Sequence, residues 1–120
     1  MLPKINRIRK KKDFESIFKN SKSFKNNLFI FKITKNELDI NRFGFIISSK
    51  VSKRATIRNK IRRRLAEIIK KEINSANQVE KLKNGKDVVI IALRGIEKKE
   101  FPILEEAVKN TIIKSGLYLK

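Results

Sequence analysis

The amino-acid sequence predicts an α+β fold in a single domain, with a small mixed sheet and the element order α-β-β-α-β-α. A chain of 120 residues, 40% of them hydrophobic, has the size of one domain with a modest core. Apolar residues alternate in some segments and recur every three or four residues in others, which are the periods of strands and helices. A long helical pattern separates the second and third predicted strands, so we expect those two strands to lie parallel in one sheet.

A basic arm and a short helix open the chain. Residues 1–12 are rich in Lys and Arg and show no clear period, so we expect an arm that becomes ordered only on a partner. A short helix follows over residues 13–20, with Asp13 as its N-cap and one apolar face. Residues 21–27 are polar and are predicted to be a simple connection.

Two strands are predicted next, separated by a turn over residues 36–42. The first spans residues 28–34 and alternates between two faces, so that Lys32 lies on the face opposite Phe31. The second spans residues 43–49 and is almost continuously apolar, as a central strand would be.

The longest predicted helix spans residues 55–73 and follows a loop over residues 50–54. Apolar residues recur there at helical spacing, as in Ile57, Ile61 and Leu65, which gives one buried stripe of an amphipathic helix.

The last part of the chain contains one more strand and one more helix. A polar segment over residues 74–86 leads to a buried strand over residues 87–93. The final helix begins at residue 98 or 99 and ends at Ile113, and Pro102 fits its first turn.

The stretch from Lys50 to Leu65 holds eight cations in sixteen residues, and it is the strongest functional signal in the sequence. Arg58 and Arg62 are four residues apart, and such a stacked like-charged pair costs roughly a few tenths of a kcal/mol. A polyanion would remove that repulsion, and arginine supplies forked donors that match phosphate oxygens. A solvated surface is the alternative. The candidate binding residues are Lys50, Lys53, Arg54, Arg58, Asn59, Lys60, Arg62, Arg63 and Arg64.

The composition favours a nucleic-acid partner and argues against catalysis by this chain. The chain carries 31 Lys and Arg against 12 Asp and Glu, a net charge of +19, and most of the excess lies within residues 1–72. It contains neither His nor Cys, so the usual general base and the thiolate metal ligand are both missing. Neither a signal peptide nor a membrane span is predicted, and we expect a soluble cytoplasmic protein. We predict no catalytic residue and no metal site.

The aromatic residues leave two interpretations open. Phe14 and Phe18 lie on one side of the short helix, either in the core or as a stacking surface for unpaired bases. Phe31 belongs to a strand of which at least one face must be core, while the other face, with basic neighbours, is free to follow a single strand. The sequence does not decide which face is which.

The chain resembles the protein subunit of bacterial ribonuclease P, over nearly its whole length and in order. The family signature is a Lys-Lys-Val-Gly-Lys-like loop followed by Arg-Asn-Arg and a basic helix, and the matching residues here are 51–55 and 58–63. Further matches lie at residues 6–10, 43–48 and 87–92.

The resemblance implies a single RNA-binding domain over residues 1–120 with a ribosomal protein S5 domain 2-like fold, whose crossover through the basic helix is left-handed. It implies a holoenzyme that removes the 5′ leader from precursor tRNA, in which the RNA subunit is the catalyst and uses Mg²⁺. The implied partners are ribonuclease P RNA, bound by the basic loop and helix, and precursor tRNA. The implied leader-binding residues are Phe14, Phe18, Phe31 and Lys32, with Phe14 slightly favoured over Phe18.

Three residues depart from the family pattern. Lys60 replaces the last Arg of the motif, which keeps the charge but loses the fork. Ser52 stands where Gly is frequent, so the shape of that loop is in question. Lys32 stands where many relatives carry an aromatic residue facing the leader, which suggests a phosphate contact in place of a stack.

Two other functional classes compete with this interpretation. A general RNA-binding or ribosome-associated protein with no processing role has the same composition. A cationic protein at a membrane surface would need a bulky apolar helix face that is free to insert, whereas the core needs that face here.

Overall fold

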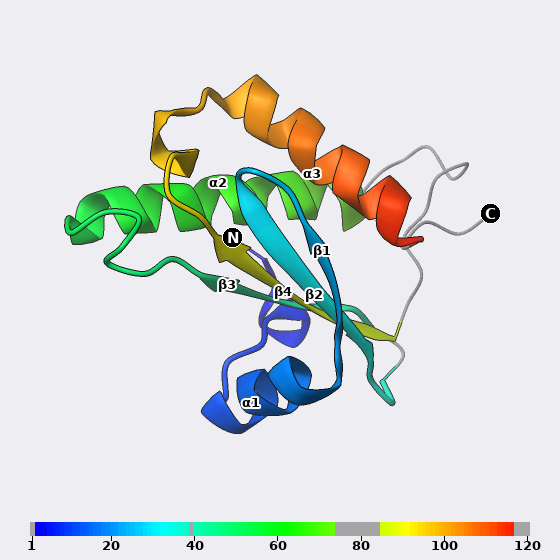
Figure 1. The fold of residues 1–120 in the computed structure, drawn as a ribbon. Helices are drawn as coiled ribbons and strands as arrows, with labels where there is room; N and C mark the ends of the chain where they lie inside the picture. The colour runs from blue at the N-terminus through cyan, green and yellow to red at the C-terminus, as the bar shows by residue number, and fades with distance from the viewer. Residues whose placement is uncertain (1, 39, 74–84, 117–120) are drawn as a thin grey trace.

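The structure is a computed structural model that describes residues 2–38, 40–73 and 85–116 of the chain. A four-stranded mixed sheet lies at its centre, with two long helices over one face and one short helix over the other (Figure 1). The elements in chain order are η1 (Lys4–Asn6), α1 (Lys11–Asn20), β1 (Lys22–Lys25), β2 (Phe29–Lys35), β3 (Arg42–Ile46), α2 (Ala55–Ile73), β4 (Lys86–Ala92), η3 (Ile96–Lys98) and α3 (Phe101–Ser115).

The strand order across the sheet is β1-β2-β4-β3. β2 pairs antiparallel with both β1 and β4, whereas β3 and β4 pair parallel, with Phe45 opposite Ile90. The helix that joins this parallel pair is α2, so the prediction of a parallel pair connected through the basic helix is confirmed. The bounds predicted for α2 also agree with the structure.

One strand was not predicted. Residues 21–27 were expected to be a simple connection, but β1 lies within them and extends the sheet by pairing Lys22 with Ile33. The strand has four residues, of which only Phe24 is apolar, and it lies at the edge of the sheet. A short polar edge strand gives no alternating apolar signal, because only one of its sides is paired and little of it is buried.

The start of α1 also differs from the prediction. The helix begins at Lys11 and its N-cap is Lys10, which makes no side-chain capping hydrogen bond. Asp13 lies inside the first turn, so its assignment as the N-cap was wrong. Its carboxylate instead accepts a hydrogen bond from Arg42.

The basic N-terminal arm is packed against the rest of the chain. Leu2 and Ile8 are buried, and the Ile8 N–H donates to the carbonyl of Phe43 at 2.9 Å. Arg7 forms an isolated parallel bridge with Phe43, so the arm lies along the open edge of β3. The expectation that this segment gains order only on a partner was therefore wrong, because Leu2 and Ile8 supply the apolar contacts that hold it.

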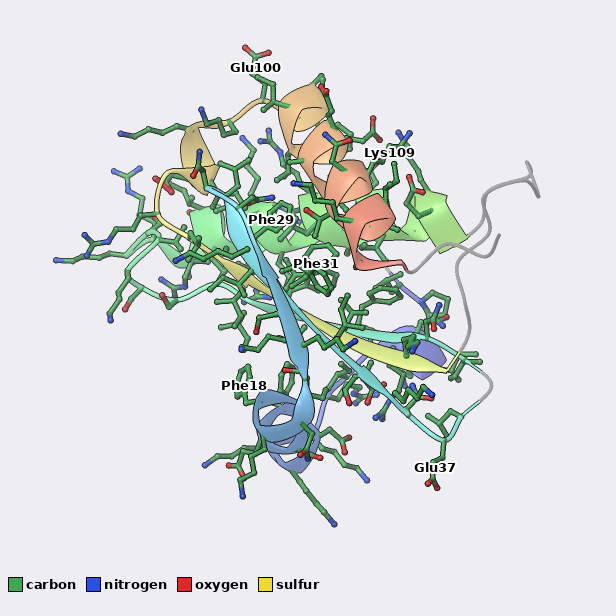
Figure 2. The ribbon with its side chains drawn as sticks, turned by 45° about the vertical axis from the view of Figure 1, so that its right-hand side comes forward. Phe18, Phe29, Phe31, Glu37, Glu100 and Lys109 are labelled. Atoms are coloured by element: carbon green, nitrogen blue, oxygen red, sulfur yellow. The ribbon has the colours of Figure 1, made fainter. Side chains whose placement is uncertain are left out.

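The core has two layers of unequal size. The larger lies between the sheet and helices α2 and α3, and it contains the fully buried Phe29, Phe31 and Val88 (Figure 2). The smaller lies under α1, on the other face, and its buried members are Ile8, Ile17 and Val89. Residues of β4 alternate between the two layers, which explains why this strand reads as continuously apolar.

The last elements follow the prediction closely. β4 spans Lys86–Ala92, and Gly95 follows with a φ of +97°, a conformation that favours glycine. α3 begins at Phe101, slightly later than predicted, with Pro102 in its first turn. The polar segment predicted over residues 74–86 falls mostly outside the described residues. In the described part of the chain, no helix is long and apolar enough to cross a membrane.

Candidate nucleic-acid interface

The basic loop and helix present their charges on the outside of the main core. α2 is held by buried apolar residues such as Ile61, Leu65 and Ile68, which leaves its other faces to charged side chains. Among the nine candidate residues, Lys50, Lys53, Arg54, Asn59, Lys60 and Arg63 are exposed, and Arg58, Arg62 and Arg64 are half-buried. All nine belong to one continuous segment that ends in the middle of α2.

Two of these arginines have partners within the chain. Arg58 Nη1 donates to the carbonyl of Ser52 at 2.9 Å, and this bond ties the basic loop to the first turn of α2. Arg62 Nη1 donates to Asn59 Oδ1 at 2.7 Å, which gives Asn59 a role that a poor helix former otherwise lacks. Arg58 and Arg62 each keep further donors that can reach a phosphate.

Ser52 fits the loop without strain. Its hydroxyl oxygen accepts the N–H of Arg54 at 3.2 Å, just before the helix begins. In the described part of the chain, positive φ occurs only at glycines, so this loop does not require glycine at position 52.

A pocket of about 630 Å³ lies at the open edge of β3. Three elements and the N-terminal arm contribute to it, which brings Asn59, Arg62 and Arg63 of α2 together with Phe14 of α1. Its lining residues are Leu2, Arg7, Ile8, Phe14, Phe43, Gly44, Phe45, Thr56, Asn59, Arg62, Arg63 and Ala66. The two groups of residues that the sequence assigned to different partners therefore meet at one hollow.

Arg7 adds a further cation to this pocket, which the sequence interpretation did not single out. The Nε atom of Arg7 is buried and has no hydrogen-bond partner among the described residues. A buried donor without a partner costs about 1–3 kcal/mol, and an anionic group in the pocket would remove that cost. With Arg62 and Arg63, three arginines line the same hollow.

Three of the four predicted leader-binding residues lie on α1 or on the sheet face beneath it. Phe14 is half-buried and rests on Gly44, where an added Cβ would lie 2.6 Å from the ring. Phe18, one turn further along α1, is 42% exposed. Lys32 of β2 points to this same face, and its Nζ donates to Ser23 Oγ at 2.9 Å.

The fourth residue, Phe31, lies on the opposite face, and its assignment as a leader-binding residue was wrong. Its side chain is 0% exposed and lies in the main core. The centroid of its ring is 5.1 Å from that of the Phe29 ring (Figure 2). Because side chains alternate along a strand, Phe31 and Lys32 cannot both face one ligand.

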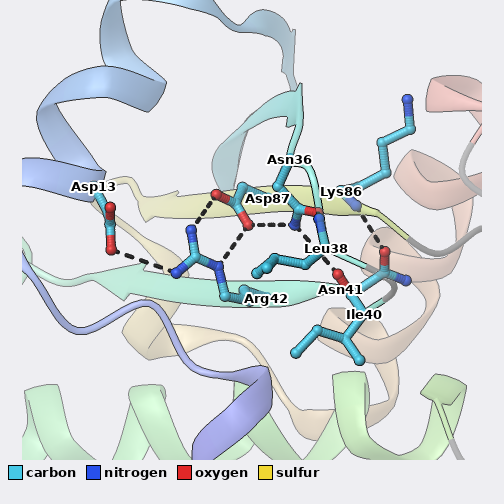
Figure 3. Close-up of polar contacts among 8 residues, drawn as sticks. All are labelled: Asp13, Asn36, Leu38, Ile40, Asn41, Arg42, Lys86 and Asp87. Carbon is cyan, nitrogen blue, oxygen red and sulfur yellow. Dashed lines mark hydrogen bonds and ion pairs between the residues drawn. The ribbon is translucent and has the colours of Figure 1, made fainter.

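A polar network beneath α1 was not predicted from the sequence (Figure 3). Arg42 of β3 donates from Nε and Nη2 to the two carboxylate oxygens of Asp87, at 2.9 and 2.7 Å. Asn36 Nδ2 donates to Asp87 as well, at 2.7 Å, and Arg42 Nη1 reaches Asp13 of α1 at 3.4 Å. The hydrogen bonds to Asp87 are the main reason that the pKa of Arg42 is raised above its already high usual value. Arg42 therefore stays charged throughout the ordinary pH range.

Comparison with known proteins identifies the family. A model of the ribonuclease P family matches residues 2–116. The chain belongs to the ribonuclease P protein family. It is 36% identical over 114 residues to the ribonuclease P protein component of Clostridium kluyveri, which covers 95% of this chain and 97% of that relative.

Two solved ribonuclease P protein structures have the same fold. The protein from Staphylococcus aureus has a TM-score of 0.83 and 25% identity, and the match covers 95% of this chain and 98% of that one. The protein from Thermotoga maritima has a TM-score of 0.73 and 30% identity, with coverage of 87% and 92%. The family resemblance and the α+β fold class expected from the sequence are thus confirmed.

As a ribonuclease P protein component, this chain is one part of an enzyme of tRNA 5′ processing that works with an RNA subunit, and it is the non-catalytic part. The family match decides against a general RNA-binding protein with no processing role. It does not test which residues bind RNA, so the assignments on α1, β2 and α2 stay predictions.

One further basic residue near the signature loop was not predicted from the sequence. Arg94 follows β4, and its Nε donates to the carbonyl of Lys50 at 3.2 Å. Positions 50 and 94 are far apart in the chain, but the parallel pairing of β3 and β4 brings the segments that follow these two strands to the same end of the sheet. Arg94 thus adds a cation to the ribonuclease P signature loop.

Proposed function

We propose that this ribonuclease P protein uses two adjoining surfaces, one for the catalytic RNA and one for the 5′ leader of precursor tRNA. The basic loop and the first half of α2 bind the catalytic RNA. Phe14 and Phe18 on α1, with Lys32 on β2, hold the leader. The observation that carries the proposal is the pocket at the edge of β3, where residues of both surfaces meet.

The charge distribution supports the assignment of the catalytic RNA to α2. Lys53 in the loop and Lys60 and Arg63 on the helix are exposed cations, and exposed cations so close together gain most from a ligand with closely spaced phosphates. The Arg58 bond to Ser52 holds the loop and the helix in one arrangement, so little order has to be gained when RNA binds.

The geometry under α1 supports the assignment of the leader to that face. Phe18 offers an exposed aromatic side chain, and Lys32 supplies a cation on the sheet face that α1 covers. Aromatic rings and cations together are what a single strand needs, because its bases are unpaired and its backbone is charged.

Mg²⁺ belongs to the RNA subunit in this proposal, and the complex acts in the cytoplasm. Among the described residues, no group of three or more His, Cys, Asp or Glu side chains is placed to hold a metal ion. No step of the proposal uses a metal held by this chain.

The test is the affinity of the reconstituted holoenzyme for precursor tRNA relative to mature tRNA. Phe18→Ala should weaken the binding of precursor tRNA relative to mature tRNA by about 1–3 kcal/mol, because one stack is lost. Mature tRNA has no leader, so its binding should not change. Ile103→Ala is the control, since Ile103 is an exposed apolar residue on the distant α3. An unchanged ratio in Phe18→Ala and in Lys32→Ala would show that the leader lies elsewhere.

A further inference from the structure

Helix α1 is weak by its own sequence. It has ten residues, which is too short for a stable isolated helix in water. Lys10, Lys11 and Lys12 lie at its N-terminus, where the helix dipole favours negative charge, and Lys10 gives no side-chain cap. Asp13 is the one acidic residue in the first turn. The position of α1 must therefore come from what it contacts.

Those contacts form a small apolar cluster that is separate from the main core. Its buried members among the described residues are Ile8, Ile17 and Val89, and the half-buried Phe14, Ile46 and Ile91 pack against them. The ion pair between Arg42 and Asp13 is the one salt bridge that links α1 to the sheet in this part of the chain.

Arg42 itself is held in place by Asp87 on the neighbouring strand. Asp87 is 7% exposed at its side chain and binds the Arg42 guanidinium through both carboxylate oxygens. Asn36 fixes that carboxylate from the other side, as Figure 3 shows. A bidentate pair of this kind sets both the distance and the orientation of the guanidinium. The remaining Nη1 therefore offers Asp13 a donor at a defined place above the sheet.

The next contact along α1 uses the same strand. Phe14 follows Asp13, and its ring rests on Gly44, which lies two residues after Arg42 and hence on the same face of β3. Two neighbouring residues of the helix thus meet two residues of one strand. Phe18 lies one helical turn after Phe14, so this double contact sets where Phe18 is presented.

We propose that Arg42 is a positioning residue, which acts through Asp13 to hold α1 in the place where its aromatic side chains meet the leader. Discrimination of precursor from mature tRNA then depends on an ion pair that does not touch RNA. The inference rests on the proposed function, because it requires that α1 contacts the leader.

The cleanest test changes Asp13 and leaves Arg42 in place. Removal of Arg42 would leave Asp87 buried without its counter-ion, which endangers the fold as a whole. Asp13→Asn removes only the link to α1. Glu15→Gln is the matched control, because it makes the same change of charge on the same helix, and Glu15 is exposed and lies 4.0 Å from Lys11. Asp13→Glu restores the carboxylate.

The measurement is the ratio of precursor to mature tRNA affinity in the holoenzyme, together with the affinity for the RNA subunit. Asp13→Asn should lower the ratio about threefold or more, while Glu15→Gln leaves it unchanged and Asp13→Glu recovers most of it. Affinity for the RNA subunit should be the same in Asp13→Asn and in Glu15→Gln, because α2 is untouched.

Phe18→Ala in the same series separates the two ways in which the inference can fail. If Phe18→Ala lowers the ratio while Asp13→Asn behaves as Glu15→Gln does, α1 binds the leader but Arg42 does not position it. If neither Phe18→Ala nor Asp13→Asn changes the ratio, α1 is not the leader surface, and the proposed function and the inference are both overturned.

Discussion

At the scale of single residues, arginines on one helix have different uses. Arg58 donates one hydrogen bond to the carbonyl of Ser52, whereas Arg63 is exposed and lines the pocket. Sequence spacing alone treats them alike, because both fall outside the main apolar stripe of α2. The difference lies in the loop that precedes the helix, which folds back onto Arg58 but not onto Arg63.

We therefore expect Arg63→Ala and Arg58→Ala to behave differently. Arg63→Ala should weaken binding of the RNA subunit and make the slope of log K against log salt shallower by about 0.7–0.9, with the free energy of unfolding unchanged. Arg58→Ala should also weaken binding but lower the free energy of unfolding by about 0.5–1.5 kcal/mol, the worth of one hydrogen bond. Urea unfolding and RNA titrations at several salt concentrations measure both quantities. Equal unfolding free energies for the two variants would show that the bond to Ser52 adds no stability.

Phe31 and Phe18 provide a second contrast at this scale. Phe31→Ala should cost about 3–5 kcal/mol of stability, because the side chain is fully buried, whereas Phe18→Ala should cost much less. Thermal unfolding of the free protein checks this without any RNA. A small loss in Phe31→Ala would mean that this side chain is not part of the main core.

The sequence predicted the two faces of β2 but not which of them is the core. Both faces carry apolar residues, Ile30 on one and Phe29, Phe31 and Ile33 on the other. The choice depends on which helices cover each face, and that is a property of the whole fold. The ion pair between Arg42 and Asp87 could not be predicted for the same reason. Its two residues come from β3 and β4, which are neighbours in the sheet but far apart in the sequence.

At the scale of elements, the predictable parts are those with a strong period. α2 was found because 19 residues repeat one apolar stripe, and β4 because its run is continuously apolar. β1 was missed because four residues at a sheet edge, of which only Phe24 is apolar, have no period of their own. The start of α1 was misplaced because the residue before the helix, Lys10, gives no capping side chain, whereas Asp13 inside the first turn resembles a cap.

The contact between Phe14 of α1 and Gly44 of β3 can be tested directly. A methyl group at position 44 would lie 2.6 Å from the Phe14 ring, so Gly44→Ala should displace the ring and loosen α1. The φ of Gly44 is not among the positive values, so backbone strain should not contribute. Hydrogen exchange should become faster in α1 and stay unchanged in β4.

Phe14→Leu combined with Gly44→Ala is the matched control for this steric argument. The smaller side chain makes room for the methyl group, so the double variant should exchange more slowly in α1 than Gly44→Ala alone. Additive effects of the two changes would show that no clash between residues 14 and 44 exists.

At the scale of the whole molecule, charge and chemistry are divided between protein and RNA. A net charge of +19 on 120 residues supplies attraction to a polyanion, and this attraction is independent of sequence and sensitive to salt. The same chain contains no His and no Cys. Both facts fit a subunit that binds and positions RNA while another component performs the chemistry.

This division predicts that the purified chain, with Mg²⁺ added, leaves precursor tRNA uncleaved, and that correct 5′ maturation appears only with the RNA subunit. Stimulation by the protein should fall in Arg63→Ala in parallel with its affinity for the RNA subunit, because we expect this residue to contribute binding alone. Gel analysis of the tRNA 5′ end, with and without RNA subunit, measures both. A trace nuclease in the preparation would act equally in the wild type and in Arg63→Ala. Cleavage by the chain alone at the mature 5′ end, lost in Arg63→Ala, would instead place catalysis on the protein and contradict the division of labour argued from its composition.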